Sequence, residues 1–197
     1  MRKSWIVAAA LAGAVLAMPG QSAAEVAVQG ESSFVVTLAV EVPAAKADVW
    51  KALIAPAKWW SSNHTYSGDA ANLYIDSQAT GCFCEKIPKP ADAPADQRMG
   101  SVEHMHIVYA DPAHGVLRLT GGLGPLQGEP VAGVWTITLK PGEGGGTQIV
   151  WDYAVNGLVR QKADVIGPMI DMVMGEQLAR LAGLFAPTDA PASAPTG

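Results

Sequence analysis

The chain is poor in cysteine, in basic residues and in long apolar runs. Only two of its 197 residues are cysteine, and it has 13 Lys and Arg against 18 Asp and Glu. It has no basic stripe, and contacts to nucleic-acid phosphates require clustered Lys and Arg, so we expect no nucleic-acid partner. Beyond residue 24, no stretch approaches the roughly 20 apolar residues of a membrane span. We therefore expect no membrane span in the mature protein.

Several catalytic motifs are also missing. The glycine-rich segment 121–128 lacks the Lys-Ser/Thr pair that a phosphate-binding loop needs. No Ser–His–Asp or Cys–His arrangement stands out, and Cys84 is not in a nucleophile elbow. The sequence thus leaves open whether the protein catalyses a reaction. The mixture of Gly and Leu in segment 121–128 instead predicts a flexible flap at the mouth of a pocket.

The N-terminus has the pattern of an export signal. Two basic residues precede an apolar stretch from Trp5 to Met18, and a run of small residues follows at 22–24. This pattern predicts a secretory signal peptide at residues 1–24, cleaved after Ala24. The alternative, a membrane anchor, is disfavoured because the apolar stretch is short for a span. Cleavage leaves 11 basic and 18 acidic residues, a net charge of −7, in a secreted or periplasmic protein.

The remaining chain divides into one domain at residues 33–186 and a tail at 187–197. The tail contains only Pro, Ala, Ser, Thr, Gly and one Asp, which predicts disorder because it buries too little apolar surface. Within the domain, helical spacing of apolar residues predicts helices at 44–54 and 164–185. Alternating apolar residues predict strands at 33–42, 72–76, 81–87, 100–109, 115–120, 133–140 and 147–156.

The predicted order is strand, helix, six strands and a long helix, which is typical of an α+β fold. Short loops between consecutive strands favour antiparallel neighbours. A curved antiparallel sheet of about seven strands, wrapped round the long C-terminal helix, would bury the apolar stripe of that helix. Such a sheet leaves a cavity between its concave face and the helix, where apolar ligands usually bind.

Several local motifs occur in an order that is known from one family. Val42-Pro43 and Trp59-Trp60 flank the first predicted helix, and residues 81–85 form a strand opening with Gly and ending with Glu. With the strands at 100–119, this order resembles the START-like or SRPBCC superfamily, whose helix-grip members include polyketide cyclase/dehydrase-like domains. The resemblance covers residues 33–186. It implies binding of a lipid, sterol, polyketide or other small apolar molecule, and it carries over no catalytic residue.

Alternation along the strands assigns candidate residues to the concave side of the sheet. Glu85 and Glu103 fall on this side, where they would be polar anchors of a ligand or, with His64, the acid/base groups of a cyclase- or hydrolase-type enzyme. The alternatives are an ordinary packed core and carboxylates that are solvated or paired with Arg118 or Lys86. The candidate ligand-binding residues are Trp60, His64, Phe83, Glu85, Glu103, Met105, Trp135, Trp151, Tyr153, Met169, Met172 and Val173.

Two cysteines and two histidines recur at a spacing of two residues. Cys82 and Cys84 would share one face of a strand, as would His104 and His106 on the next strand. Together they would form a ligand set suited to zinc or copper. The alternative is two buried thiols with two surface imidazoles, because a Cys82–Cys84 disulfide would be strained. We expect no cofactor unless this set binds zinc or copper.

Overall fold

The computed structural model describes residues 23–186. The predicted signal peptide, apart from Ala23 and Ala24, and the predicted tail at 187–197 lie outside the described residues. The strands are β1 (Ala23–Gly30), β2 (Ser33–Val42), β3 (Leu73–Ile75), β4 (Cys82–Ile87), β5 (Gly100–Asp111), β6 (Val116–Thr120), β7 (Val131–Pro141) and β8 (Thr147–Gly157). The helices are α1 (Lys46–Leu53) and α2 (Ala163–Gly183), and the 3₁₀ turns are η1 (Pro56–Lys58), η2 (Ser62–His64), η3 (Ala70–Asn72), η4 (Gly124–Gly128) and η5 (Glu143–Gly145).

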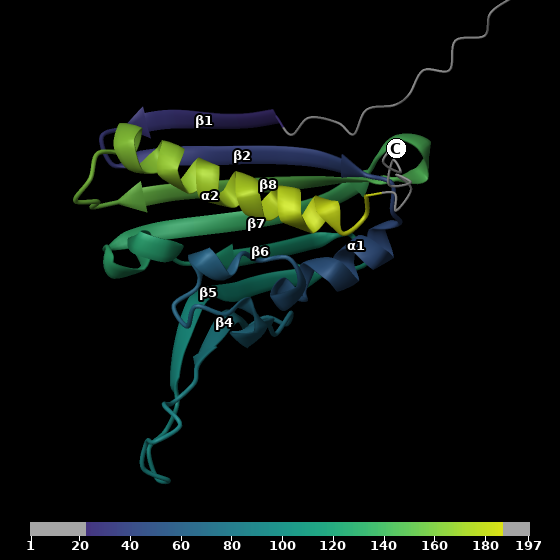
Figure 1. The fold of residues 1–197 in the computed structure, drawn as a ribbon. Helices are drawn as coiled ribbons and strands as arrows, with labels where there is room; N and C mark the ends of the chain where they lie inside the picture. The colour runs from purple at the N-terminus through teal and green to yellow at the C-terminus, as the bar shows by residue number, and fades with distance from the viewer. Residues whose placement is uncertain (1–22, 187–197) are drawn as a thin grey trace, which may run out of the picture.

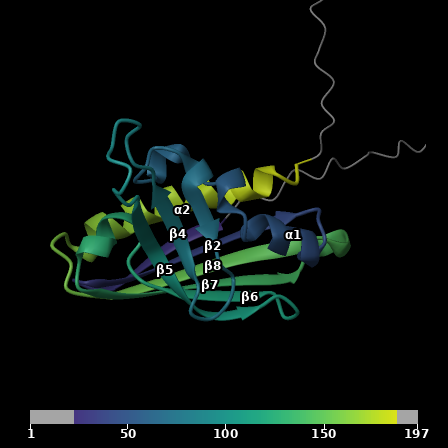
Figure 2. The ribbon, with the colours of Figure 1, turned by 90° about the horizontal axis from the view of Figure 1, so that it is seen from below.

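All eight strands belong to one antiparallel sheet, in the order β1-β2-β8-β7-β6-β5-β4-β3. The long helix α2 crosses one face of this sheet, and α1 lies on the same side (Figure 1). Seen from below, the sheet bends towards α2, and β4 and β5 pass in front of the central strands (Figure 2). The α+β fold predicted from the sequence, a curved sheet wrapped round a C-terminal helix, is confirmed.

Burial of alternate side chains fixes the register of the central strands. Phe34 and Leu38 of β2 are buried, and their partners across β8 are Val155 and Trp151, which are buried as well. A shift of one residue would move these side chains to the solvent face, so the apolar pattern selects this register. The concave face is consequently apolar from β2 to β6.

The sequence prediction missed β1, which makes the sheet one strand larger than expected and extends the folded unit to Ala23. Its residues alternate weakly, because Ala and Gly occupy several positions. β1 pairs with β2, and Ala23 and Ala24 lie opposite Ala39 and Leu38. The predicted cleavage after Ala24 therefore falls inside the first strand of the sheet.

The interior contains a chain of aromatic rings in contact. The ring centroids of Trp135 and Trp151 are 4.8 Å apart, and Trp59 continues the series 5.9 Å from Trp151. Trp60 follows at 5.5 Å from Trp59 and lies edge-on to Phe83 at 5.0 Å. Edge-to-face pairs of this kind add about 0.5–1.5 kcal/mol beyond the burial of their area. The rings of Trp59 and Trp60, which follow α1, thus pack against rings on the sheet.

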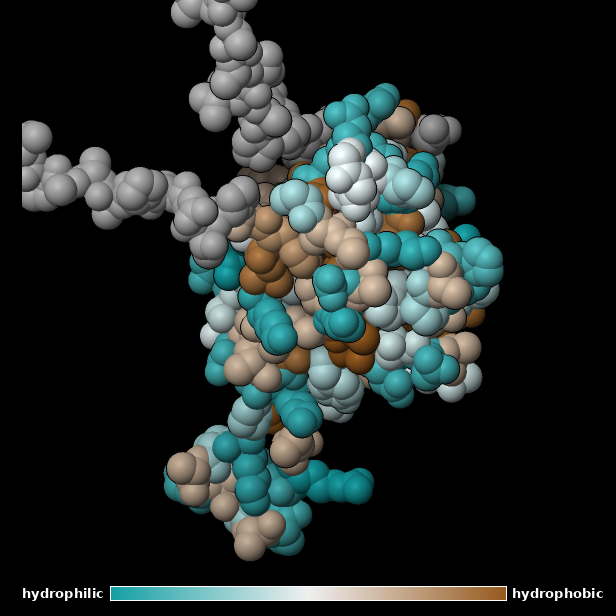
Figure 3. All heavy atoms as spheres, turned by 90° about the vertical axis from the view of Figure 1, so that its right-hand side faces the viewer, coloured by the Kyte–Doolittle hydropathy of each residue, from teal (hydrophilic) through white to brown (hydrophobic). Residues whose placement is uncertain are grey.

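The surface is mixed in character. Figure 3 shows polar and apolar side chains intermingled at one end of the molecule, with the tip of the β4–β5 hairpin standing clear of the body. Among the residues that the structure describes, no helix is long and apolar enough to cross a membrane.

Candidate functional site

A cavity of about 280 Å³ lies where α2 meets the η2 segment, the η4 loop and β5. Its volume is close to the lower end of the roughly 300–1,000 Å³ range of small-molecule sites. Most of its lining is apolar, and each of the four elements contributes at least one side chain. The lining residues are Trp60, His64, Thr65, Tyr66, His104, Leu123, Gly124, Pro125, Ile170, Val173 and Met174.

Hydrogen bonds to α2 hold the first wall of the cavity in place. The backbone N–H of Ser61 donates to the side-chain oxygen of the buried Gln177 at 2.7 Å. Arg180 donates from Nε to the carbonyl of Trp59 at 2.7 Å. His64 and Glu176 approach to 3.0 Å, and the hydrogen bond from His64 is the main cause that lowers the pKa of the Glu176 carboxyl. The helix thus fixes the segment that bears Trp60 and His64.

A buried tyrosine fixes the second wall, the loop that contains η4. The Tyr153 hydroxyl donates to the carbonyl of Gly121 and accepts from the backbone N–H of Leu123, both at 3.0 Å. Burial raises the pKa of Tyr153 to about 12, so the hydroxyl keeps its proton. A Cβ atom at Gly133 would collide with the Gly121 carbonyl oxygen, so only glycine allows this close approach. The predicted flexible flap is anchored at its base.

The mouth of the cavity is closed partly by one contact between the two walls. The hydroxyl of Tyr66 lies 3.4 Å from the carbonyl oxygen of Gly124. Tyr66 is exposed, as are Gly124 and Pro125 beside it. This contact is long for an O–H donor and open to water, so it is weak. The exposed part of the η4 loop and Tyr66 form the rim.

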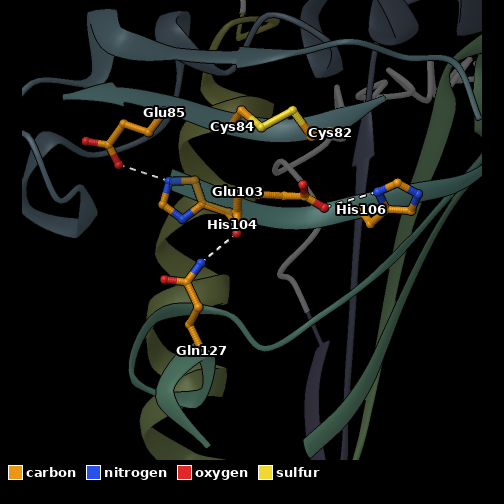
Figure 4. Close-up of a disulfide and its surroundings, with 7 residues drawn as sticks. All are labelled: Cys82, Cys84, Glu85, Glu103, His104, His106 and Gln127. Atoms are coloured by element: carbon orange, nitrogen blue, oxygen red, sulfur yellow. Dashed lines mark hydrogen bonds and ion pairs between the residues drawn. A yellow bond between two sulfur atoms is a disulfide. The ribbon is translucent and has the colours of Figure 1, made fainter. Parts of the chain in front are cut away.

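The floor of the cavity contains a buried Glu–His pair. Glu85 of β4 is 0% exposed and the His104 side chain of β5 is 6% exposed. Nε2 of His104 lies 2.9 Å from Oε2 of Glu85. A dashed line marks this contact in Figure 4. The same Oε2 accepts from the backbone N–H of Tyr66 at 3.0 Å, and Oε1 accepts from that of Ser67. His104 borders the cavity, whereas Glu85 lies behind it.

The surroundings of this pair set its protonation. Burial by itself would raise the pKa of Glu85, but the hydrogen bonds from Ser67, Tyr66 and His104 outweigh burial and lower it. Burial lowers the pKa of His104 below 6.5, although the hydrogen bond and charge of Glu85 oppose this effect. At neutral pH the pair is therefore a carboxylate and an uncharged imidazole.

A β-bulge turns His104 towards the cavity. Phe83 pairs with Met105 and Cys84 pairs with Glu103, so His104 is an extra residue in β5. A bulge interrupts the alternation of side chains, and His104 and Met105 are both buried as a result. The sequence prediction continued the alternation through this point. It therefore placed Glu103 inside, whereas the structure places the Glu103 side chain outside with 54% exposure.

The structure brings only part of the predicted ligand-binding set together. Trp60, His64 and Val173 line the cavity. Met169 and Met172 do not, because they lie on the outer side of α2 with 48% and 67% exposure. The predicted residues that lie in the packed core, outside the lining, are Phe83, Met105, Trp135, Trp151 and Tyr153.

The structure also separates the four residues of the predicted metal set. Cys82 and Cys84 form a disulfide, which leaves no thiolate. Their Cα atoms are 5.4 Å apart, closer than the roughly 6.6 Å of regular strand neighbours and within the usual range for bridging. His106 is 45% exposed and pairs with Glu103 at 3.1 Å, on the face opposite His104. In residues 23–186, no group of three or more His, Cys, Asp or Glu is arranged to hold a metal ion.

The sequence prediction did not include several lining residues. Tyr66 was not among the predicted residues, and alternation assigned His104 to the face of the sheet opposite Glu103, the residue predicted to lie on the concave face. Leu123, Gly124 and Pro125, from the η4 loop, had a signal in the sequence, because they belong to the Gly-rich segment that predicted a flap. Ile170 had one too, because it belongs to the apolar stripe of the last helix. The residues not included are Thr65, Tyr66, His104, Leu123, Gly124, Pro125, Ile170 and Met174.

No protein-family model matches the chain, and no curated protein matches its sequence. Solved structures do match. A protein from Mesorhizobium loti is 17% identical, over 79% of this chain and 99% of that one, with a TM-score of 0.52. An uncharacterized protein from Rhizobium leguminosarum is 19% identical, over 84% and 97% of the two chains, with a TM-score of 0.52. CalU16 from Micromonospora echinospora is 14% identical, over 85% and 86%, with a TM-score of 0.51. At such identities the likeness shows the fold alone, a helix-grip arrangement of curved sheet and long C-terminal helix.

Proposed function

We propose that the chain is an exported START-like protein that binds a small hydrophobic or aromatic molecule in the cavity between α2 and the sheet. The observation that carries this proposal is the apolar lining, which surrounds one buried imidazole. Ligand sites typically combine an apolar wall with a few placed polar groups. An apolar cavity of roughly 150 Å³ accepts benzene. A volume of about 280 Å³ therefore suits a molecule of one or two rings.

Two observations support export. The pattern at residues 1–24 is that of a cleavable signal, and the Cys82–Cys84 disulfide is of a kind that persists in oxidising compartments. Fractionation of cells that express the full chain tests this part. We expect a periplasmic or secreted protein that begins at Glu25. Recovery of the chain with Met1 intact in the cytoplasm would contradict it.

Ligand binding is tested with naphthalene derivatives and the tryptophan fluorescence of the mature protein. Trp60 borders the cavity, so its emission reports a bound ring. We expect saturable quenching with a dissociation constant on the order of 10–100 µM, as ligand efficiency allows for about ten heavy atoms. No saturable change with any derivative would contradict the proposal.

A matched pair of substitutions on α2 locates the binding. Val173→Phe adds a ring inside the cavity and is expected to weaken binding at least tenfold by filling space. Met172→Phe adds the same ring one residue earlier, where the side chain is 67% exposed, and is expected to leave affinity unchanged. Equal effects of the two substitutions would place the ligand elsewhere.

A further inference from the structure

The histidine at the floor of the cavity indicates which polar group a ligand should carry. This inference rests on the proposed binding function. His104 is the only side chain of the buried Glu–His pair that borders the cavity. Its imidazole has two nitrogens. Nε2 is committed to Glu85, so only Nδ1 remains for a ligand.

The partners of Glu85 decide which nitrogen of His104 bears the proton. The Glu85 carboxylate accepts two backbone N–H bonds, from Tyr66 and Ser67, and contacts His104. An ionised carboxylate has no proton to donate, so the contact requires a proton on Nε2 of His104. In the uncharged imidazole, Nδ1 is then a hydrogen-bond acceptor.

Nδ1 of His104 makes no hydrogen bond to any residue between 23 and 186. Figure 4 shows this nitrogen turned away from Glu85, towards the side on which the η4 loop and α2 lie. The other polar side chains at the cavity each have one partner: Nε2 of His64 pairs with Glu176, the Thr65 hydroxyl donates to the Ser62 carbonyl, and the Tyr66 hydroxyl contacts Gly124. Of the two histidines at the cavity, His104 is the more deeply buried, with 6% exposure against 30% for His64, and its Nδ1 has no partner among the described residues.

We propose that Nδ1 of His104 accepts a hydrogen bond from the ligand, and that the ligand is a neutral, apolar molecule bearing a hydroxyl group, such as a phenol or an alcohol. A ligand with only acceptor groups would leave Nδ1 unpaired in an apolar site, which costs binding free energy. A carboxylate ligand would place a negative charge next to that of Glu85, which is buried directly behind the imidazole. The Glu–His pair therefore selects against both classes.

Three ligands of one ring system test the proposal on the mature wild-type protein. 2-Naphthol donates a hydrogen bond, 2-methoxynaphthalene only accepts, and 2-naphthoate carries a negative charge. From the usual net contribution of a hydrogen bond, we expect 2-naphthol to bind about fivefold tighter than 2-methoxynaphthalene at pH 7.5. We expect 2-naphthoate to bind more weakly than both.

A matched pair of histidine variants assigns the preference to one imidazole. His104→Phe keeps a ring against Phe83 but removes Nδ1, and is expected to abolish the preference for 2-naphthol. His106→Phe makes the same change two residues along β5, on the opposite face, and is expected to preserve it. Should His104→Phe fail to fold, equal binding of 2-naphthol and 2-methoxynaphthalene to the wild type would still overturn the proposal.

The outcomes separate this inference from the proposed function. If none of the three ligands binds, the proposed function fails. If 2-naphthol and 2-methoxynaphthalene bind equally well to the wild type, or if 2-naphthoate binds most tightly, the cavity is a ligand site but the assignment of Nδ1 is wrong. A hydroxyl preference that persists in a folded His104→Phe variant would also overturn the assignment.

Discussion

Two Glu–His pairs lie on the neighbouring strands β4 and β5, with nearly the same distance between partners. Glu85 and His104 are 2.9 Å apart, and Glu103 and His106 are 3.1 Å apart (Figure 4). The first pair is almost completely buried, whereas both side chains of the second pair are about half exposed. The distance between partners is thus no guide to the role of each pair.

The two pairs differ in their access to water. At the exposed pair, water replaces a lost partner, so such pairs contribute about 0–1 kcal/mol. At the buried pair no water does so, and removing one partner leaves charged or polar groups unsatisfied. We therefore expect the loss of either partner of the first pair to destabilise the fold, and His104 of this pair also borders the cavity. The predictions below test this contrast.

The largest effect is expected from removal of the buried carboxylate. Glu85→Ala leaves the N–H groups of Tyr66 and Ser67 and the ring N–H of His104 without their acceptor. Since each unsatisfied buried group costs about 1–3 kcal/mol, we expect the free energy of unfolding to fall by at least about 3 kcal/mol. Urea denaturation at pH 7.5 measures the change.

The matched substitution at the exposed pair is Glu103→Ala. Its side chain is solvated, so the free energy of unfolding should change by less than about 0.5 kcal/mol. Similar losses for Glu85→Ala and Glu103→Ala would show that burial does not separate the two pairs.

An intermediate effect is expected from the disulfide, which lies on β4 opposite the exposed pair. Cys82 pairs across the sheet with His106, and Cys84 with Glu103. Because the disulfide closes a very short loop, the double variant Cys82→Ala with Cys84→Ala should lose only about 1.5 kcal/mol of unfolding free energy. Urea denaturation of the variant and of the oxidised wild type measures this loss.

The buried pair should survive loss of the disulfide, because Glu85 is also held by backbone N–H groups outside β4. The preference for 2-naphthol should therefore persist in the double cysteine variant. Loss of this preference in a folded variant would mean that the disulfide, and not the backbone around Glu85, maintains the position of His104.

Most of the fold could be predicted from the sequence, because alternation and helical spacing are local signals. The predicted strand at 33–42 coincides with β2, and the predicted last helix at 164–185 overlaps nearly all of α2. β1 gave too weak a signal, since its Ala and Gly residues do not mark an inner and an outer face. Its position in the sheet depends on pairing with β2, which a local pattern does not show.

Much less of the site could be predicted, because its key residue depends on a bulge. One extra residue in β5 reverses the sides that alternation assigns, and no residue type marks the bulge in the sequence. Glu85 was predicted correctly to face inwards, since the pattern of β4 is regular at that point. The structure buries His104 and exposes Glu103, which is the reverse of the prediction.

Hydropathy misled the prediction on α2 for a different reason. Met169 and Met172 are apolar but exposed, whereas the polar Gln177 is fully buried. Gln177 is accommodated because it accepts a hydrogen bond from the Ser61 backbone, 116 residues away in the sequence. Such a partner becomes visible only in the folded chain.

The pH dependence of stability is expected to differ between the two pairs as well. Because burial lowers the pKa of His104 in the folded protein, the unfolded chain, with its imidazole near pKa 6.5, binds this proton first as the pH falls. The free energy of unfolding should therefore decrease below about pH 6.5, by less than the roughly 1.4 kcal/mol per pH unit allowed for one proton. Glu85, whose folded pKa is lowered from 4.5, contributes in the same direction only below that value.

A pair of variants assigns the change between pH 7 and pH 5 to one imidazole. The titratable groups around His104 are Glu85 behind it and, at the cavity, Tyr66 and His64. His104→Phe should flatten the decrease measured by urea denaturation, while His106→Phe, a change of the same kind on the opposite face of β5, should retain it. If both variants retain the wild-type slope, His104 does not titrate as a buried imidazole. The difference in stability between the two pairs would then come from the hydrogen bonds of Glu85 alone.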